Sequence, residues 1–452
     1  SNEVAVVKEP ISPLGKDLRS YIKLKGPITL HDYMAQGLNH LLHGYYQGKG
    51  EVIGEGGDFI TAPEVSQLFG EMLGIWCLSM WENMGKPDKL YLIELGPGKG
   101  TLMKDIMKVS ARFPEFKKAI SVHFVELSAV LRRRQYDALQ CTGLLESTTT
   151  TTTTTTSNNS NSSMSWHSFL QQVPSDAPVL VIGQEFLDAF PVHQFVYTEK
   201  GWREKLVDAE DGQKEAYHFR FVLSPSATPA VRSILLNTQT NNTNNTTTAA
   251  TSTNTSTSVD SIDKETNTAP TTTTTISNIT TTQSASSSIS DIARPSAKIG
   301  DGVEISPLAI ATCEDVAQRV VSCGGAALLV DYGEDFTQED SLRAFYKHKQ
   351  VSVLSQPGMV DLTADVDFAL CRRAAVNKGA RVPILLTQGD FLMRMGVVSR
   401  VEQLLELEET TDEAANALVA SLKYLVEPAQ MGSRFKVLSI VNPTIPAVTG
   451  FE

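Results

Sequence analysis

An apolar run that passes into a glycine-rich loop and then into a helix-forming stretch constrains the fold of this chain more than any other feature. Residues 90–95 (LYLIEL) are hydrophobic throughout except for Glu94, as in a strand that is buried on both faces. The sequence GPGKG follows at 96–100, and residues 101–112 have the pattern of a helix. Glycine lets the backbone turn sharply and lets its amides approach a ligand closely. The succession predicts an α/β domain that binds a ligand at this loop.

The alternation of strands and helices continues along the chain, which predicts a mostly parallel sheet with helices on both faces. Further buried strands and one helix are expected at 120–125, 177–182 and 326–331, and at 128–139. Later in the sequence we expect antiparallel strands within 192–207 and at 217–223, a helix over 399–425 and a closing strand at 435–441. We predict that residues 89–452 form one Rossmann-like domain and that the antiparallel strands extend its sheet.

Residues 1–88 are predicted to form an additional helical region. Thr29 is placed to cap a helix whose apolar face runs from Leu30 to Leu42. A second helix is expected to begin at Thr61, where Glu64 would complete a capping box, and to continue past residue 80. Its large apolar side chains are spaced as a packing stripe rather than as ligand contacts.

Two threonine-rich segments interrupt the globular pattern. Residues 148–163 contain nine consecutive threonines, and residues 237–290 are rich in Thr, Asn and Ser with almost no aromatic or large aliphatic side chains. Such segments cannot bury enough apolar surface to offset the entropy lost on ordering, about 1 to 2 kcal/mol per residue. We predict that both are disordered insertions in surface loops.

Charge and cysteine content exclude several classes of function. The formal net charge is −12, whereas a general nucleic-acid-binding protein would carry a basic surplus, so no nucleic-acid partner is expected. The five cysteines form no CxxC pair, which argues against a structural metal site or a disulfide framework. No apolar run approaches about 18 residues, so no transmembrane segment is expected. The first twenty residues do not form an Arg-rich presequence.

The glycine loop differs from those that bind dinucleotides or ATP. Its spacing is G-x-G-x-G rather than G-x-G-x-x-G, and no GKS or GKT follows. Glu94 would repel a pyrophosphate but suits a ligand with an ammonium and a sulfonium group. Glu126 ends the next strand, where a carboxylate can accept both ribose hydroxyls. These features favour S-adenosylmethionine over a tight turn that binds nothing. The candidate donor-binding residues are Glu94, Gly96, Gly98, Gly100, Thr101, Glu126 and Thr61.

Some of these assignments remain open. Thr61, with Asp58, could close over the donor, or Thr61 could be no more than a helix cap. Trp166 and His167 fall near the third strand, where an adenine could stack.

Longer motifs support a family resemblance over nearly all of the chain outside the threonine-rich segments. They are GDFITAPE (57–64) with SQLFGEMLG, IELGPGKGTL (93–102), GQEFLDAFPVHQF (183–195), LLVDYG (328–333), DLTADVDF (361–368) and TQGDFLMRMG (387–396). In these the chain resembles the MidA-type family of mitochondrial methyltransferases, which assist the assembly of respiratory complex I. The resemblance implies a class I methyltransferase fold, S-adenosylmethionine as donor, an arginine of a core complex I subunit as acceptor, and a mitochondrial matrix location. Gln184 and Asp365 stand where the family commonly has Asn and His, and the second change puts any inherited role of that position in doubt.

An arginine acceptor assigns a role to acidic residues. A guanidinium has a pKa of about 12.5 or more, so removing its proton beforehand at neutral pH would cost about 7.5 kcal/mol. Carboxylates can instead clamp the guanidinium and accept its proton late in the transfer. Glu185 and Asp188 follow the strand at 177–182 and are the candidate catalytic pair. Asp188 could alternatively cap the turn that follows, and His193 and Asp331 could be structural or functional.

Two other functions remain open. The chain could be a non-catalytic assembly chaperone that retains the methyltransferase fold, or a methyltransferase for a small molecule. The intact glycine loop favours an enzyme, because a pure scaffold does not need Glu94, three glycines and Glu126 together.

Overall fold

The computed structural model describes residues 8–48, 61–140, 164–212, 216–236, 297–407 and 410–452, and the two threonine-rich segments lie outside these ranges. In the described part, an eight-stranded sheet has the order β15-β16-β10-β5-β2-β3-β4, with β14 paired to β10. Its parallel strands are β2 (Leu90–Leu95), β3 (Ile120–Val125), β4 (Met164–His167), β5 (Val179–Gln184), β10 (Gly325–Glu334) and β14 (Val366–Asp367). The closing strand β16 (Phe435–Val441) is antiparallel to β10 and to β15 (Leu386–Thr387). The predicted α/β, Rossmann-like fold is confirmed.

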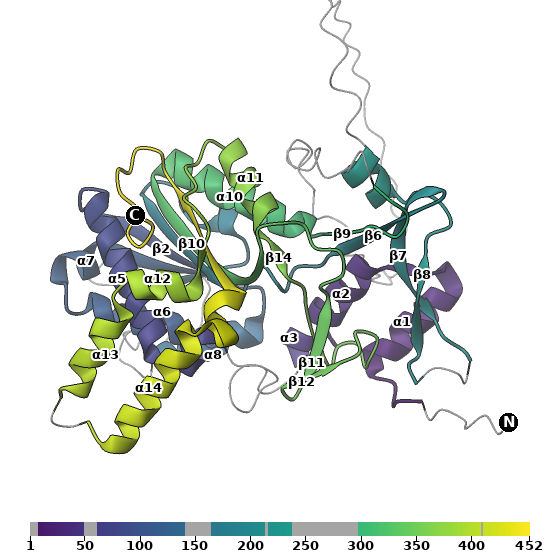
Figure 1. Ribbon diagram of the computed structural model, residues 1–452, viewed down its shortest axis with the longest axis horizontal. Helices are drawn as coiled ribbons and strands as arrows, with labels where there is room; N and C mark the ends of the chain where they lie inside the picture. Colours follow the sequence, from purple (N-terminus) through teal and green to yellow (C-terminus); the bar gives the residue numbers. More distant parts are fainter. Residues whose placement is uncertain (1–7, 49–60, 141–163, 213–215, 237–296, 408–409) are drawn as a thin grey trace, which may run out of the picture.

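Helices cover both faces of this sheet because its strands carry apolar side chains on both sides (Figure 1). Leu90 and Leu92 of β2 join one hydrophobic cluster, while Tyr91, Ile93 and Leu95 join the other. The first cluster includes α5 (Gln67–Asn83), α6 (Thr101–Ser110), α7 (Pro114–Ala119), α8 (Ala129–Gln140), α12 (Gln388–Arg394), α13 (Val397–Leu405) and α14 (Asp412–Val426). The second includes α10 (Pro307–Cys323) and α11 (Phe368–Asn377).

The antiparallel strands do not extend the main sheet, so this part of the sequence-based prediction is wrong. They form a separate sheet of order β1-β7-β6-β9, with β8 paired to β7. Its strands are β1 (Ile28–Thr29), β6 (His193–Thr198), β7 (Gly201–Ala209), β8 (Phe219–Leu223) and β9 (Gly302–Ile305). Part of this sheet has a cover of its own, because Val207 and Phe219 pack with the buried side chains of α1 (Pro13–Lys25) and α2 (Leu30–Asn39). Phe195, Val303 and Ile305 instead join the hydrophobic cluster of the main sheet.

A three-stranded sheet completes this second part of the molecule, which lies beside the main sheet in Figure 1. It consists of β11 (Arg343–Tyr346), β12 (Lys349–Val351) and β13 (Asp361–Thr363), and it shares a hydrophobic cluster with α1, α2 and α3 (Tyr45–Gly48). The helices of residues 1–88 are therefore divided: α1 to α3 pack here, whereas α4 (Ala62–Val65) and α5 pack on the main sheet. The boundary at residue 88 stays a prediction.

Three expected helices differ in their bounds. Thr29 caps α2 as predicted, its hydroxyl accepting from the Asp32 amide, but α2 ends at Asn39, and Leu41 and Leu42 are exposed. The helix expected at Thr61 is divided at Ser66, which has an extended backbone and caps α5 through the Leu68 amide. Thr61 makes no side-chain capping bond, so the predicted capping box is wrong. The helix expected over 399–425 is two helices, because Thr411 begins α14 with a cap of its own.

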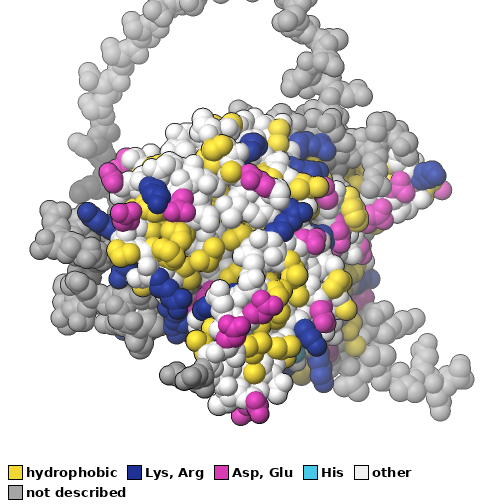
Figure 2. Space-filling model, turned by 60° about the vertical axis from the view of Figure 1, so that its left-hand side comes forward, with side chains coloured by type: hydrophobic (Ala, Val, Ile, Leu, Met, Phe, Trp, Pro, Cys, Tyr) yellow, Lys and Arg dark blue, Asp and Glu magenta, His cyan; other side chains and the backbone are white. Residues whose placement is uncertain are grey.

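The face that comes forward in Figure 2 shows hydrophobic side chains among charged ones. Exposed apolar residues of the C-terminal helices include Met393, Leu405 and Tyr424. None of the helices in the described ranges has both the length and the apolar character needed to span a bilayer.

Candidate functional site

The glycine loop lies at the carboxyl end of β2 and begins α6. Gly96, Gly98 and Gly100 all have positive φ (60°, 53° and 83°), a backbone region that side chains disfavour. The Gly96 amide donates to the Val125 carbonyl over 3.0 Å, which holds the loop beside the end of β3. Thr101, the first residue of α6, donates its hydroxyl hydrogen to Glu64 Oε1, so α4 is anchored to the loop. The loop predicted from sequence is therefore built as the backbone chemistry requires.

Glu94 is buried next to this loop with part of its hydrogen-bonding capacity unused. Its side chain is 3% exposed, and Oε2 has no hydrogen-bond partner among the described residues. Burial raises the pKa of Glu94 to about 8. A buried carboxylate of this kind is stabilised by a cationic partner. The surroundings of Glu94 thus fit a ligand with an ammonium and a sulfonium group, although its contact with the donor stays a prediction.

The contribution of Glu94 to the unfolding free energy should fall as the pH rises, because Glu94 stays protonated in the folded protein up to a pH of about 8. The ordinary pKa of a glutamate is 4.5. Between these values the folded state holds a proton on Glu94 that the unfolded state has released. The stability that depends on this proton is therefore fully present below about pH 4.5 and is lost as the pH approaches 8. The slope from one such group is about 1.4 kcal/mol per pH unit. Urea unfolding of Glu94→Gln should show a weaker pH dependence than the wild type, and an unchanged slope would contradict this account.

Glu126 lies after β3, and a buried glutamine joins it to the glycine loop. Glu126 Oε1 accepts from the Ser128 amide over 2.8 Å, and burial raises its pKa. Gln135 of α8 donates through Nε2 to both the Gly98 carbonyl (2.9 Å) and Glu126 Oε2 (3.3 Å). Gln135 Oε1 accepts from Trp166 Nε1 over 2.9 Å. The predicted ribose carboxylate and the loop are thus held by one side chain, which the sequence analysis missed.

Replacing Gln135 with Leu should weaken donor binding by about tenfold, the loss expected when a hydrogen bond to a charged group is removed. The variant removes the donor to Glu126 Oε2 and to the Gly98 carbonyl, and also the acceptor of Trp166 Nε1. Calorimetric titration with S-adenosylhomocysteine measures the effect. Arg133→Leu is the matched control, since Arg133 is exposed on the same helix and pairs with Asp137. Equal affinities for both variants would contradict a positioning role for Gln135.

The candidate catalytic pair lies after β5, across from the loop. Glu185 has a positive φ (49°), which is uncommon for a residue with a side chain. Its Oε1 accepts from the Ala62 amide over 3.3 Å and from the neighbouring Gln184 side chain. Burial raises the pKa of Glu185 to about 8, and the charge of Asp188 acts in the same direction. The two carboxylates are therefore close enough to influence each other, and their catalytic role stays a prediction.

Asp188 does not cap the turn that follows β5, because Asp331 has this role. Asp331 Oδ2 accepts from the amides of residues 186, 187 and 188, at 3.1, 2.9 and 3.3 Å. Asp188 Oδ2 instead accepts from the hydroxyl groups of Tyr332 and Thr363, the latter over 2.7 Å. Its Oδ1 is buried without a hydrogen-bond partner in the described part of the chain. Tyr332 and Thr363 lie in motifs used for the family resemblance, but their roles depend on a contact that the sequence does not show.

The other candidate residues from the sequence mostly contact protein side chains away from the carboxylate pair. His193 lies 2.7 Å from buried Glu204 and stacks on His31, which supports a structural role. Trp166 stacks on Phe124, and the His167 side chain contacts that of His123 over 3.0 Å, so both have protein partners. Asp58 lies outside the described residues. Thr61 precedes α4, a short helix that is held to Glu185 through the Ala62 amide and to Thr101 through the Glu64 carboxylate.

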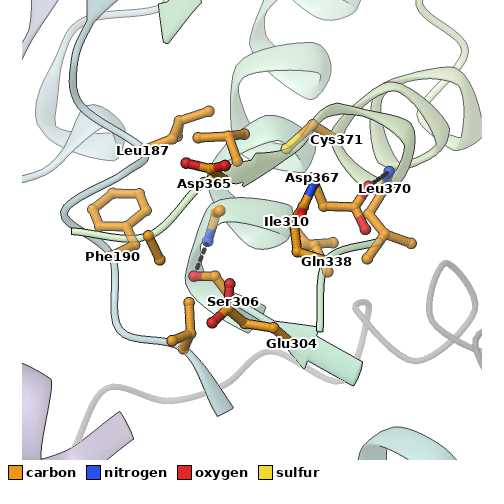
Figure 3. A pocket seen from close by; sticks show the side chains of 14 residues that line it. Leu187, Phe190, Glu304, Ser306, Ile310, Gln338, Asp365, Asp367, Leu370 and Cys371 are labelled. Atoms are coloured by element: carbon orange, nitrogen blue, oxygen red, sulfur yellow. Dashed lines mark hydrogen bonds between the residues drawn. The ribbon is translucent and has the colours of Figure 1, made fainter. Parts of the chain in front are cut away.

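A small cavity lies beside this site but does not include the carboxylate pair (Figure 3). Leu187 and Phe190 line it from the segment after β5, and Glu304, Asp365 and Asp367 line it from other elements. Neither Glu185 nor Asp188 is a lining residue. The cavity therefore lies next to the candidate site rather than between the two carboxylates.

Comparisons with known proteins agree with this geometry. Residues 72–265 and 250–385 match a family model described as "Putative S-adenosyl-L-methionine-dependent methyltransferase". The chain is 34% identical over 439 residues to protein arginine methyltransferase NDUFAF7, mitochondrial, of Homo sapiens, covering 96% of this chain and 84% of the relative. The chain is also 34% identical, over 442 residues, to the NDUFAF7 homolog of Drosophila melanogaster, and the alignment covers 96% of this chain and 86% of the relative.

The fold also resembles a crystal structure from Burkholderia thailandensis. That protein is described as a "likely methyl transferase" bound to S-adenosyl-homocysteine. The TM-score is 0.70 at 22% sequence identity, and the alignment covers 98% of this chain and 97% of the other. At this identity the similarity concerns the fold.

Proposed function

Because this chain belongs to the MidA-type family of S-adenosyl-L-methionine-dependent methyltransferases, we propose that it methylates an arginine side chain of a mitochondrial protein. Relatives named as mitochondrial protein arginine methyltransferases, at 34% identity over nearly the whole chain, support the acceptor and the location. The donor would supply an electrophilic methyl group on a sulfonium. The protein's own residues then have to hold the acceptor and take up one proton.

The observation that carries the proposal is the unused acceptor capacity of the carboxylate pair. Asp188 Oδ1 is buried without a hydrogen-bond partner in the described structure, and Glu185 lies three residues away with a raised pKa of about 8. A guanidinium has five N–H donors in a planar fork that suits two carboxylates. We propose that Asp188 and Glu185 clamp this fork, orient one nitrogen and accept its proton as the bond to carbon forms. A pKa near 8 makes Glu185 a better proton acceptor than an ordinary glutamate.

We further propose that the acceptor arginine belongs to a core subunit of respiratory complex I. This finer assignment is supported by the family resemblance of the motifs and not by the geometry of the site. The second part of the molecule consists of two sheets with α1 to α3 and lies beside the main sheet. We propose that it adds surface on which a protein acceptor could bind.

Transfer of labelled methyl groups tests the proposal. The protein is incubated with tritiated S-adenosylmethionine and the unmethylated complex I core subunits, and methylarginine is determined after hydrolysis. Label in arginine supports the enzyme, and label in other side chains would contradict arginine as the acceptor. If the subunits bind the protein but acquire no label while the donor is bound, the non-catalytic chaperone becomes the better description.

A further inference from the structure

We infer that Tyr332 and Thr363 are positioning residues for methyl transfer, fixing Asp188 so that its Oδ1 is presented to the acceptor guanidinium, and that an Arg343–Asp365–Arg434 cluster holds Tyr332 in place. The inference rests on the proposed function, because it specifies how the acceptor side of that site is built.

The first step is the geometry at Asp188. The hydroxyl groups of Tyr332 and Thr363 both contact Oδ2 and also contact each other, so this oxygen is occupied by a linked pair of hydroxyl groups from two different elements, β10 and β13. Oδ1 is left without a hydrogen-bond partner among the described residues. Two hydroxyl donors on one oxygen fix the rotation of the carboxylate plane. They therefore determine which oxygen faces the acceptor.

The second step is the support of Tyr332. The guanidinium carbons of Arg343 and Arg434 each lie 5.4 Å from the centre of the Tyr332 ring, within the range of cation–π contacts. Both guanidinium groups are tied to Asp365 Oδ1, at 2.5 Å for Arg343 and 3.4 Å for Arg434. Phe435 packs edge-on against the same ring, with centroids 5.4 Å apart. The ring is thus held by two cations, one shared carboxylate and one aromatic side chain.

The third step is the electrostatic environment. The ionisable groups that act on or are acted on by Asp188 are Tyr46, Glu185, Asp331, Tyr332 and Arg343, and the charge of Asp361 acts on three of these groups, Tyr46, Glu185 and Tyr332. Burial raises the pKa of Asp188, while the hydroxyl groups of Tyr332 and Thr363, the Ala189 amide and the charge of Arg343 oppose this rise. Arg343 is the cation of this group, and Asp365 holds it in place. Asp365, where the family commonly has His, thereby acquires a role in this chain.

Tyr332→Phe tests the inference, because it removes the hydroxyl group and keeps the ring between the two arginines. We expect the pH at which Asp188 ionises to rise by about one unit, the shift that corresponds to a tenfold change in equilibrium. Carbon-13 NMR of protein labelled in aspartate measures this midpoint without any acceptor, and the spectrum of Asp188→Asn identifies the resonance. Asp365→Asn should shift the midpoint in the same direction by a smaller amount. Tyr424→Phe, at an exposed tyrosine of α14, is the matched control.

Methyl transfer supplies the second measurement. In Tyr332→Phe the transfer rate at pH 7 should fall about 10- to 100-fold, the acidic limb of the rate profile should move to higher pH, and the affinity for S-adenosylhomocysteine should stay within twofold. An unchanged Asp188 midpoint, or an unchanged rate profile, would overturn the positioning role. If no variant and not even the wild type methylates arginine, the proposed function fails, whereas the NMR midpoint still decides whether Tyr332 controls Asp188.

Discussion

Replacing Glu185 with Gln lowers the rate of methyl transfer to arginine by about 10²- to 10⁴-fold, the range expected when a general base is removed. Glutamine can still accept from the Ala62 amide, so the local backbone is retained. It cannot take up the proton that the guanidinium releases. In the wild type, the pKa of about 8 predicts that the rate rises with pH up to this value, because the carboxylate form accepts the proton. Glu185→Gln should lose the part of the rise that ends near pH 8 and keep the limb that Asp188 sets at lower pH. Single-turnover measurements over pH 6 to 9 separate the chemical step from product release.

The matched control is Glu199→Gln, at an exposed position on the turn between β6 and β7. It changes the same charge and should leave both the rate and its pH dependence as in the wild type. Donor affinity should be preserved in both variants, which shows that each is folded. A Glu185→Gln enzyme with the wild-type rate would exclude Glu185 as the proton acceptor and leave Asp188 as the remaining candidate.

Gly96→Ala should reduce donor affinity by at least 100-fold and also slow methyl transfer. Two effects combine at this position. The backbone φ of 60° disfavours any side chain, and the new Cβ would lie 2.6 Å from Phe186 Cδ2. A contact this short forces either the loop or the Phe186 ring to move. Because Phe186 follows Glu185 directly, displacement of the ring also disturbs the candidate base. Calorimetry with S-adenosylhomocysteine measures the first effect and single-turnover assays the second.

Gly201→Ala is a control variant that introduces the backbone strain of a positive φ without the steric collision expected at Gly96. Gly201 has a φ of 80° and no heavy atom within 4 Å of the position that a Cβ would take. It should cost about 1 kcal/mol of stability and leave donor affinity unchanged. Adding Phe186→Leu to Gly96→Ala removes part of the colliding ring and should recover part of the lost affinity. If the double variant binds no better than Gly96→Ala, collision with Phe186 is not the cause of the loss.

The strands whose bounds were predicted best are those marked by the residues of the strand itself and its immediate neighbours in the sequence. β2, β3 and β16 have the predicted bounds, 90–95, 120–125 and 435–441, because each is a short apolar run between turn signals. The second sheet was assigned to the wrong partner, since alternation shows that a strand has one buried face but does not identify what covers it. The cover of β7 and β8 comes from α1 and α2, more than 150 residues earlier in the sequence.

The same limit applies to the candidate site. Glu94 and Glu126 could be proposed because they stand at fixed offsets from the glycine loop and the next strand. Gln135, Tyr332 and Asp365 could not, because each acts through contacts between segments far apart in the chain. The sequence allows either a structural or a functional role for Asp331. Its carboxylate accepts from three backbone amides after β5, so an acid at the end of one buried strand stabilises the turn that follows the neighbouring strand.

The short helix α4 has a consequence for how the two substrates bind. At one end the Ala62 amide contacts Glu185, and within the same turn Glu64 accepts from Thr101 and lies 3.7 Å from Lys99. If Glu185 meets the acceptor and the glycine loop meets the donor, as proposed, any shift of α4 that improves the fit to one substrate alters the side chains that meet the other. Such coupling is reciprocal: the factor by which the donor changes affinity for the acceptor equals the factor by which the acceptor changes affinity for the donor.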